Sequence, residues 1–387
     1  MKFNKLPIIF VQGAGRTGFD LLRTLLDGHE EVLIFPFTDK FTANWKINNL
    51  SENSSIDELV KKLLYGSKIR SFKEKFYLNA GTIHDYSDVD WQNYIRYFRE
   101  FFIENKVNSR NARLAIYYAL ARTINVDLNK LSVLVADGYY NDQTQFILQD
   151  FPKARFLHLV KDHRAHIFSL KEYYRKANGT MYPVIGNVRN MFLHVLMDNM
   201  HQNMRMLDRN KLNLGNKLKV LKYENLLIEP KETLNNLSHW LGIEYNDGLL
   251  KTTRIGKPSN SNSAFNEKPV TGINPEFAFR WKRQMSAYEI RMIEYLFGRS
   301  MLKLGYEKVY PLSVRNKIIG FLSCFLPWKG EIFPHQRIIK NTNFQINPVA
   351  LWKYFKYGIY LFNGILGYIC SRFYLFYYIL SGKFKAL

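Results

Sequence analysis

Residues 8–18 read IIFVQGAGRTG, and residues 19–28 read FDLLRTLLDG. A short apolar run therefore ends in a glycine-rich turn, after which apolar residues recur with helical spacing. This order predicts a strand, a tight loop and the first turns of a helix. Backbone N–H groups and the positive end of the helix dipole converge at such a loop, so the stretch predicts an anion-binding site.

The chain as a whole is large and strongly basic. Its 387 residues allow one large α/β domain or two smaller ones. The hydrophobic content of 47% excludes a wholly disordered chain, and the formal charge of +22 predicts an anionic partner such as a nucleotide, an acidic glycan or a membrane surface. Two cysteines, Cys324 and Cys370, are too few for a disulfide framework and suit a reducing compartment.

Strand and helix patterns alternate along most of the chain. Four short apolar runs predict buried parallel strands, at 6–11, 131–136, 155–160 and 218–223. Helical spacing and capping residues predict helices at 54–64, 89–102, 185–210 and 286–305. The alternation predicts an α/β fold in three layers, a central parallel sheet flanked by helices, with ligands at the carboxyl ends of the strands. The Gly-, Ser-, Asn- and Pro-rich segment 256–275 is expected to be a loop, either a connector or a lid.

The composition changes after about residue 312, which divides a main domain (1–312) from a C-terminal helical extension (313–387). From 311 to the end, ten Lys or Arg accompany one acid, Glu331, and aromatic residues are dense between Trp352 and Tyr378. This mixture favours a bilayer interface, with core packing or a spanning helix as the alternatives. The N-terminus does not read as a signal peptide. We therefore expect a cytoplasmic protein that is peripheral at the inner face of a membrane.

The glycine loop admits three interpretations. Its residues are Gly13, Ala14, Gly15, Arg16, Thr17 and Gly18. They satisfy the G-x-G-x-x-G dinucleotide pattern, and Asp39 lies about 20 residues later, where a ribose-binding acid is expected. A Walker A loop is excluded, because Phe19 and Asp20 replace its Lys and its Mg²⁺-binding hydroxyl. The third interpretation is a metal-free cradle for a 5′-phosphosulfate, held by the guanidinium fork of Arg16.

A second basic segment, RFLHLVKDHRAHIFSL (155–170), combines a strand, a basic turn and a helix. Lys161, Arg164 and Ser169 follow the carboxyl end of that strand, so they can collect around a second phosphate. Paired with the glycine loop on another strand of the same sheet, this segment predicts a clamp for two phosphates.

With these two segments in place, the sequence resembles the sulfotransferases that use 3′-phosphoadenosine 5′-phosphosulfate (PAPS), over most of residues 5–310. VQGAGRTGFDLLRTLLDGHEEV is similar to that family's 5′-phosphosulfate loop and helix, and FPKARFLHLVKDHRAHIFSL to its 3′-phosphate segment. LKYENLLIEPKETLNNLSHWLGI and FRWKRQMSAYEIRMIEYLFGRSMLKLGY resemble later family blocks in the same order. The resemblance implies the P-loop-like sulfotransferase fold and metal-free transfer of a sulfuryl group from PAPS.

The resemblance also implies roles for single residues. The loop from Gly13 to Phe19 would hold the 5′-phosphosulfate, with Arg16 foremost and catalytic. Lys161 and Ser169 would hold the 3′-phosphate, with Arg164 close by. Because PAPS leaves as 3′-phosphoadenosine 5′-phosphate (PAP), both phosphates should be recognised in the product as well.

The chain departs from the family pattern at several of these positions. Phe19 and Asp20 stand where phosphate-binding hydroxyls are usual, and an acid there is expected to turn away from a bound phosphosulfate. Lys161 replaces the usual Arg, which keeps the charge and loses the bidentate fork. His163 replaces the usual Pro.

Transfer to a hydroxyl also requires a proton acceptor. Some relatives carry a Glu at the position of Phe37, so we assign this role to Asp39, the nearest acid, with a solvated loop carboxylate as the alternative. His29 is expected to cap or pack the first helix. His194, Asp198 and His201 share a helical face without a further ligand cluster, and no metal is expected.

The residues lead to one preferred function and two alternatives. The preferred function is sulfation of a carbohydrate or lipid-linked glycan presented at a membrane surface. The alternatives are a non-catalytic nucleotide-binding protein of the same fold, favoured by Phe19 and Asp20, and an NAD-type oxidoreductase that uses the glycine loop with Asp39. No nucleic-acid recognition motif accompanies the charge, so no nucleic-acid partner is expected.

Overall fold

The chain divides into two compact units. The computed structural model describes residues 2–36, 41–65, 89–138, 143–180, 193–259, 272–326, 368–377 and 379–380. The first unit comprises Met1–Val160, Arg209–Asn262 and Glu267–Pro275, and the second comprises Lys161–Asp208, Ser263–Asn266 and Glu276–Leu387. Each unit is therefore assembled from segments that are distant in sequence.

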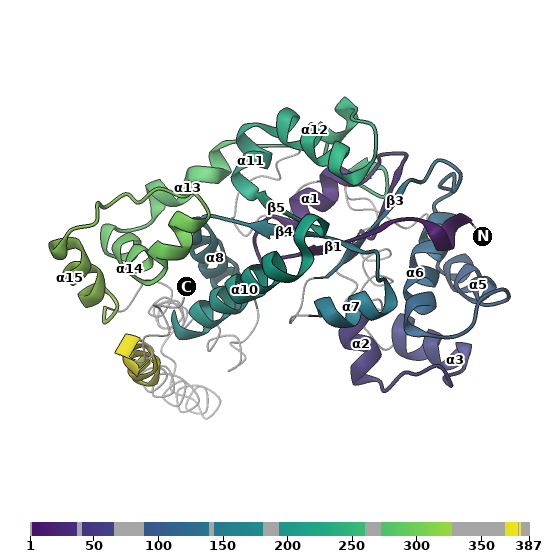
Figure 1. Ribbon diagram of the computed structural model, residues 1–387, viewed down its shortest axis with the longest axis horizontal. Coiled ribbons are helices and arrows are strands. Elements are labelled where there is room, and N and C mark those ends of the chain that lie inside the picture. The colour runs from purple at the N-terminus through teal and green to yellow at the C-terminus, as the bar shows by residue number, and fades with distance from the viewer. Residues whose placement is uncertain are drawn as a thin grey trace, which may run out of the picture. The chain divides into compact units, whose positions relative to one another are not determined.

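The first unit is built on a five-stranded parallel sheet (Figure 1). Its strands are β1 (Ile8–Gln12), β2 (Val32–Ile34), β3 (Val133–Asp137), β4 (Arg155–Val160) and β5 (Leu218–Lys222), in the order β2-β3-β1-β4-β5. Val11 of the central strand β1 lies opposite Asp137 on one side and Leu157 on the other. Because parallel strands share one carboxyl edge, the loop after β1 emerges between the ends of β3 and β4.

This sheet confirms the predicted fold class, and four of its strands lie where apolar runs predict them. The strand β2 escaped prediction because its three residues are too few for an apolar pattern to register. The helices predicted at 54–64 and 89–102 therefore lie between β2 and β3. The helix predicted at 54–64 is a short α3 (Ile56–Leu59) that continues as a π-helix over Val60–Tyr65.

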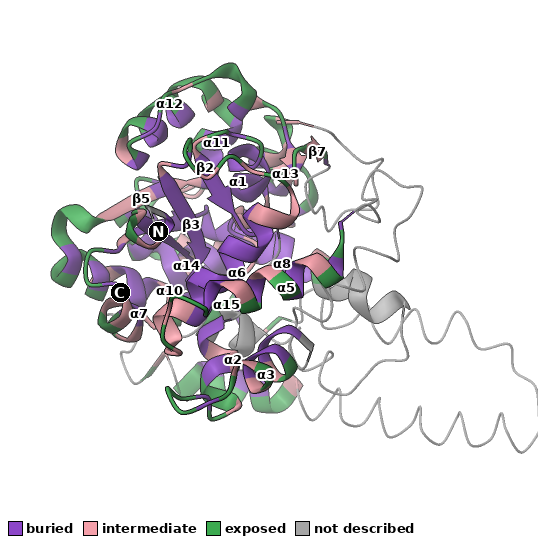
Figure 2. Ribbon diagram, turned by 90° about the vertical axis from the view of Figure 1, so that its right-hand side faces the viewer, coloured by how far each residue is buried: buried purple, intermediate pink, exposed green. Residues whose placement is uncertain are grey.

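Helices cover both faces of the sheet. Besides α3, the first unit contains α1 (Phe19–Leu26), α2 (Phe41–Ile47), α5 (Trp91–Phe101), α6 (Ser109–Thr123), α7 (Thr144–Asp150), α11 (Tyr223–Ile228) and α12 (Pro230–Leu241). Ile8 and Phe10 of β1 pack into the cluster formed with α5 and α6, while α1, α11 and α12 lie on the other side of the sheet (Figure 1). Figure 2 shows the sheet as the buried centre of this arrangement.

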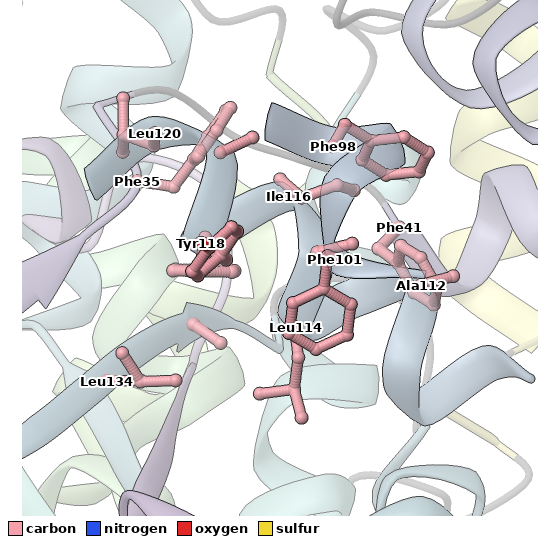
Figure 3. Close-up of a cluster of buried hydrophobic side chains, with 14 of the residues drawn as sticks. Phe35, Phe41, Phe98, Phe101, Ala112, Leu114, Ile116, Tyr118, Leu120 and Leu134 are labelled. Carbon is pink, nitrogen blue, oxygen red and sulfur yellow. The ribbon is translucent and has the colours of Figure 1, made fainter. Parts of the chain in front are cut away.

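Aromatic side chains dominate the core on the α5 and α6 side (Figure 3). The rings of Trp91 and Tyr94 stack with centroids 5.1 Å apart, and the Tyr94 hydroxyl donates to the carbonyl of Ile116 at 3.0 Å. The buried guanidinium of Arg113 lies over the ring of Phe41 and donates to the carbonyl of Asp137 at 3.2 Å. That bond ties α6 to the carboxyl end of β3.

The second unit is helical in its described residues. It contains α8 (His163–Thr180), α13 (Glu276–Gln284), α14 (Ala287–Lys303), α15 (Val314–Ser323), a helical stretch at 368–377 and most of α10 (Leu193–Leu214). Buried ion pairs join α8 to α14, since Lys171 lies 2.8 Å from Glu289 and Arg164 lies 2.6 Å from Glu294. The predicted capping box is present, because Glu289 also accepts from the backbone N–H of Ser286 at 3.0 Å.

The C-terminal extension is only partly within the described ranges. The boundary predicted at residue 312 falls between α14 and α15 and stays a prediction, and residues 260–271 of the predicted loop lie outside those ranges. Where the structure describes the chain, no helix has both the length and the apolar character needed to cross a bilayer. Cys324 is buried and Cys370 exposed, and neither forms a disulfide.

Candidate active site

The glycine loop joins β1 to α1 in a tight turn. Gly13 and Gly18 have φ angles of 143° and 103°, and Arg16 between them has a φ of 71°. The Thr17 side chain donates to the carbonyl of Ala14 at 2.7 Å, which closes the turn on itself. The helix α1 then starts without a side-chain cap, and its first bond runs from the Leu22 N–H to the Gly18 carbonyl at 3.0 Å.

Both terminal glycines of the loop are required by close approach as well as by φ. A Cβ on Gly13 would lie 2.8 Å from the carbonyl oxygen of Leu159 in β4. A Cβ on Gly18 would lie 2.2 Å from Cδ2 of Tyr223. The loop is therefore pressed against the neighbouring strand at one end and against α11 at the other.

Gly18→Ala is expected to lower affinity for PAP by about tenfold, because overpacking costs about 1–3 kcal/mol and the added Cβ would displace the backbone of the loop that is predicted to bind the nucleotide. The matched control is Gly242→Ala, which has a similar φ of 78° but no atom within 4 Å of the added Cβ. Both variants carry the left-handed penalty of about 1 kcal/mol. Calorimetric titration with PAP and thermal unfolding would separate them, and equal behaviour of the two variants would contradict the packing argument.

Arg16 is the half-buried cation of the loop and a non-glycine residue with a positive φ. A non-glycine residue in the left-handed region costs about 1 kcal/mol, so the surrounding structure must hold it there. Its guanidinium is permanently charged and can grip two anionic oxygens at once. A strained arginine at the amino end of a helix is an arrangement suited to binding and polarising an anion.

Asp20, the acid expected to oppose an anion, is compensated by two arginines. It lies 3.0 Å from Nη2 of Arg254 and 3.3 Å from Nη1 of Arg23. The Arg23 guanidinium also stacks 4.3 Å from the centroid of the Phe19 ring. Burial lowers the pKa of Arg23, and the charges of Asp20 and Asp137 act against that shift. The two arginines therefore balance the negative charge of Asp20 in the first turn of α1.

A hairpin that sequence reasoning missed clamps α1 at both ends. It consists of β6 (Thr253–Arg254) and β7 (Lys257–Pro258). Arg254 holds Asp20 at the start of α1, and at its end the Asp27 carboxylate accepts from the backbone N–H groups of Ile255 and Gly256, each at 2.9 Å. Burial raises the pKa of Asp27, and these two bonds oppose the rise. No local signal in the sequence links the hairpin to α1.

A buried polar chain lies beneath the loop. Gln12, the last residue of β1, accepts from the side-chain amide of Asn210 at 2.7 Å and donates to the Thr144 hydroxyl at 2.9 Å. On the neighbouring strand, Asp137 is a buried carboxylate at the carboxyl end of β3. The acid that ends the apolar run LSVLVAD (131–137) is the sequence signal for this position.

Lys161, Arg164 and Ser169 all lie in the second unit and are all buried. Lys161 follows the last residue of β4 directly, and Ser169 lies two turns into α8. The strand β4 is the neighbour of β1, so the two predicted phosphate segments follow adjacent strands. The two-phosphate clamp itself stays a prediction.

Arg164 has a structural role in the second unit. Its guanidinium donates to both carboxylate oxygens of Asp162, to Glu294 and to the carbonyl of Glu307, at 2.6–2.9 Å. It also lies 4.2 Å from the centroid of the Trp281 ring. These contacts join α8, α13 and α14, and they account for Trp281 as a packing residue.

Two buried histidines, His163 and His29, hold neighbouring chain segments in place. Burial lowers the pKa of His163 to about 4, and its Nε2 lies 2.8 Å from the Ser300 hydroxyl. His29, as expected, packs at the end of α1, where its Nε2 lies 2.9 Å from the carbonyl of Glu244. Both rings therefore fix chain segments in place.

Four residues singled out in the sequence fall wholly or by their side chains outside what the structure describes. Asp39 and Phe37 lie outside the described ranges, as do the side chains of His194 and Asp198. Burial lowers the pKa of His201 to about 4. Among the described residues no group of three His, Cys, Asp or Glu side chains is placed to hold a metal.

The chain is similar to known sulfotransferases in sequence pattern and in fold. No curated protein matches the chain. Similar solved structures include the sulfotransferase domain from the curacin biosynthetic pathway, at 17% identity, with a TM-score of 0.48 and coverage of 78% of this chain and 98% of that chain. The sulfotransferase domain from the Synechococcus PCC 7002 olefin synthase has 16% identity, a TM-score of 0.39 and coverage of 79% and 96%. Sulfotransferase STF9 from Mycobacterium avium has 12% identity, a TM-score of 0.38 and coverage of 78% and 77%. A model of the sulfotransferase family matches residues 7–247, which include the glycine loop and segment 155–170.

Proposed function

Because the chain belongs to the sulfotransferase family and is a sulfotransferase, we propose that it moves a sulfuryl group from PAPS to a hydroxyl of a carbohydrate or glycolipid. This membership replaces the NAD-type interpretation of the glycine loop. The observation that carries the proposal is Arg16, held in a left-handed conformation between β1 and the amino end of α1. The family match supports the reaction class, and the donor and acceptor are the proposed part.

The residues of the loop fit a phosphosulfate. Gly13 and Gly18 bring the backbone into a tight turn at a helix amino end, and Arg16 supplies a charge without a metal. The arginine pairing of Asp20 removes the strongest objection to anion binding there. Lys161, at the carboxyl end of the adjacent strand, is the proposed partner of the 3′-phosphate, with Ser169.

The proposed reaction is an in-line displacement at sulfur. The acceptor oxygen forms a bond to sulfur while the bond from sulfur to the bridging oxygen breaks, PAP leaves with the electron pair, and the hydroxyl proton passes to a carboxylate. By analogy with phosphoryl transfer, catalysis consists of alignment and of positive charge on the oxygens that gain charge. Arg16 is the proposed source of that charge and Asp39 the proposed proton acceptor.

The acceptor class is supported by the charge of the whole chain. A formal charge of +22 suits an acidic glycan or a lipid-linked glycan close to an anionic surface.

Calorimetric titration with PAP and 5′-AMP in the absence of Mg²⁺ tests the donor. PAP is expected to bind at least about tenfold more tightly, because the 3′-phosphate adds a charge-assisted contact. Lys161→Ala should remove this difference by weakening PAP alone. The matched control is Lys153→Ala, an exposed lysine before the amino end of β4. Equal affinities of the wild-type protein for the two nucleotides would exclude PAPS as donor.

A further inference from the structure

The described part of the C-terminal extension contains two helices whose outward faces are apolar. On α15, Gly320, Ser323 and Cys324 are buried, whereas Val314, Ile318 and Leu322 are 74%, 53% and 57% exposed. An ordinary surface helix presents polar residues to solvent, so this exposed apolar stripe requires an explanation of its own.

Close packing explains the inward face of α15. A Cβ on Gly320 would lie 2.8 Å from Cβ of Tyr295 and 3.1 Å from the carbonyl of Arg291, so the helix touches α14 through a residue without a side chain. The outward face is then left to Val314, Ile318 and Leu322, which share an arc of about 80° at 3.6 residues per turn. Burial against α14 therefore does not account for these three apolar residues.

The helical stretch 368–377 repeats the pattern beside α15. Ser371, Arg372 and Leu375 are buried, while Phe373 is 72% exposed and Phe376 and Tyr377 are also exposed. The stretch is fastened to the end of α15, because the Tyr368 hydroxyl donates to the carbonyl of Phe325 at 2.6 Å and Arg372 donates to that of Leu326 at 2.9 Å. One buried arginine thus secures a surface that is aromatic on its outside.

We propose that these two outward faces, which we call the apolar face (Val314, Ile318, Leu322, Phe373, Phe376 and Tyr377), dock on an anionic lipid bilayer. Exposed Arg315 and Lys317 flank the stripe of α15 on its two sides, where their charged ends can reach lipid phosphates while the stripe enters the headgroup region. The exposed aromatic rings are also of the kind that lies in the headgroup region of a bilayer.

The flanking charge selects a membrane over a second copy of the chain. Two copies paired through this face would bring Arg315 and Lys317 toward their own counterparts, and the segment from 311 to the end carries ten basic residues against one acid. An anionic surface gains from each of these charges. This inference depends on neither the donor nor the acceptor proposed above.

Sedimentation of the full chain with vesicles tests the proposal. We expect binding to phosphatidylcholine vesicles that contain phosphatidylglycerol, weaker binding to phosphatidylcholine alone, and loss at high salt. Ile318→Glu should weaken binding to the anionic vesicles by at least about tenfold. Arg315→Gln with Lys317→Gln should remove most of the preference for the anionic lipid.

The matched control is Leu212→Glu on α10, where an even more exposed apolar residue lies outside the apolar face. This variant should bind vesicles like the wild-type protein, and PAP binding of every variant should be unchanged. Failure of the wild-type protein to sediment with anionic vesicles, or equal loss in Leu212→Glu, would overturn the proposal. Dimerisation in the absence of lipid that Ile318→Glu abolishes, with vesicle binding intact, would also overturn it and assign the face to a second copy.

Discussion

Arg16→Ala is expected to lower the turnover number for sulfuryl transfer by about 100- to 1000-fold, the effect of removing one donor aimed at developing charge. The guanidinium can meet oxygens of the phosphosulfate, and those oxygens gain charge as the bond to sulfur breaks. Affinity for PAP should fall less than turnover, because the product no longer carries the sulfuryl group. Single-turnover kinetics and calorimetry with PAP measure the two quantities separately.

Two further variants at the same position separate charge from backbone conformation. Arg16→Lys keeps the charge and loses the planar fork, so it should recover part of the lost turnover. Arg16→Gly relieves the left-handed backbone strain and should be more stable than Arg16→Ala while remaining equally slow. Turnover of Arg16→Ala close to that of the wild-type protein would remove Arg16 from the catalytic step.

Asp39→Asn is expected to lower turnover by about 100- to 10,000-fold, because the amide cannot accept the proton of the acceptor hydroxyl. Asp39 itself lies outside the described residues. Three residues earlier, the carbonyl of Pro36 accepts from one nitrogen of Arg254, and the other nitrogen donates to Asp20, in the first turn of α1, at 3.0 Å. Arg254 therefore fastens Pro36 to the start of α1.

Asp137→Asn is the control for this assignment. Asp137 is the buried carboxylate on the strand beside β1, and its charge interacts with Arg23. Its replacement should lower the free energy of unfolding without a comparable loss of turnover, and PAP affinity should be unchanged in Asp39→Asn. Slow turnover in Asp137→Asn together with normal turnover in Asp39→Asn would move the proton acceptor to β3.

Features that depend on neighbours in sequence were predictable. The apolar run before Gly13 announces β1, and the structure places Gly13 and Gly18 in the left-handed backbone region that their loop requires. The capping box of Ser286 and Glu289 starts α14 as its spacing predicts. In each case the physical cause acts within a few residues, so a local pattern carries it.

Features that depend on distant partners were not predictable. Arg254 pairs with Asp20 across 234 positions, and the sequence around each residue gives no sign that the two are partners. The resemblance predicts Arg164 close to the 3′-phosphate, whereas the structure pairs it with Glu294, 130 positions away, in a buried network. Burial and charge pairing of this kind appear only once the chain is folded.

The hairpin of β6 and β7 also sets an order of events during synthesis. All five strands of the sheet and the whole glycine loop precede residue 223, but the contacts that the hairpin makes to Asp20 and Asp27 come later, from Arg254, Ile255 and Gly256. A growing chain can therefore assemble its sheet before the hairpin clamps α1. A chain that stops short of the hairpin contains every strand of the sheet and the whole glycine loop, but it lacks these contacts at both ends of α1.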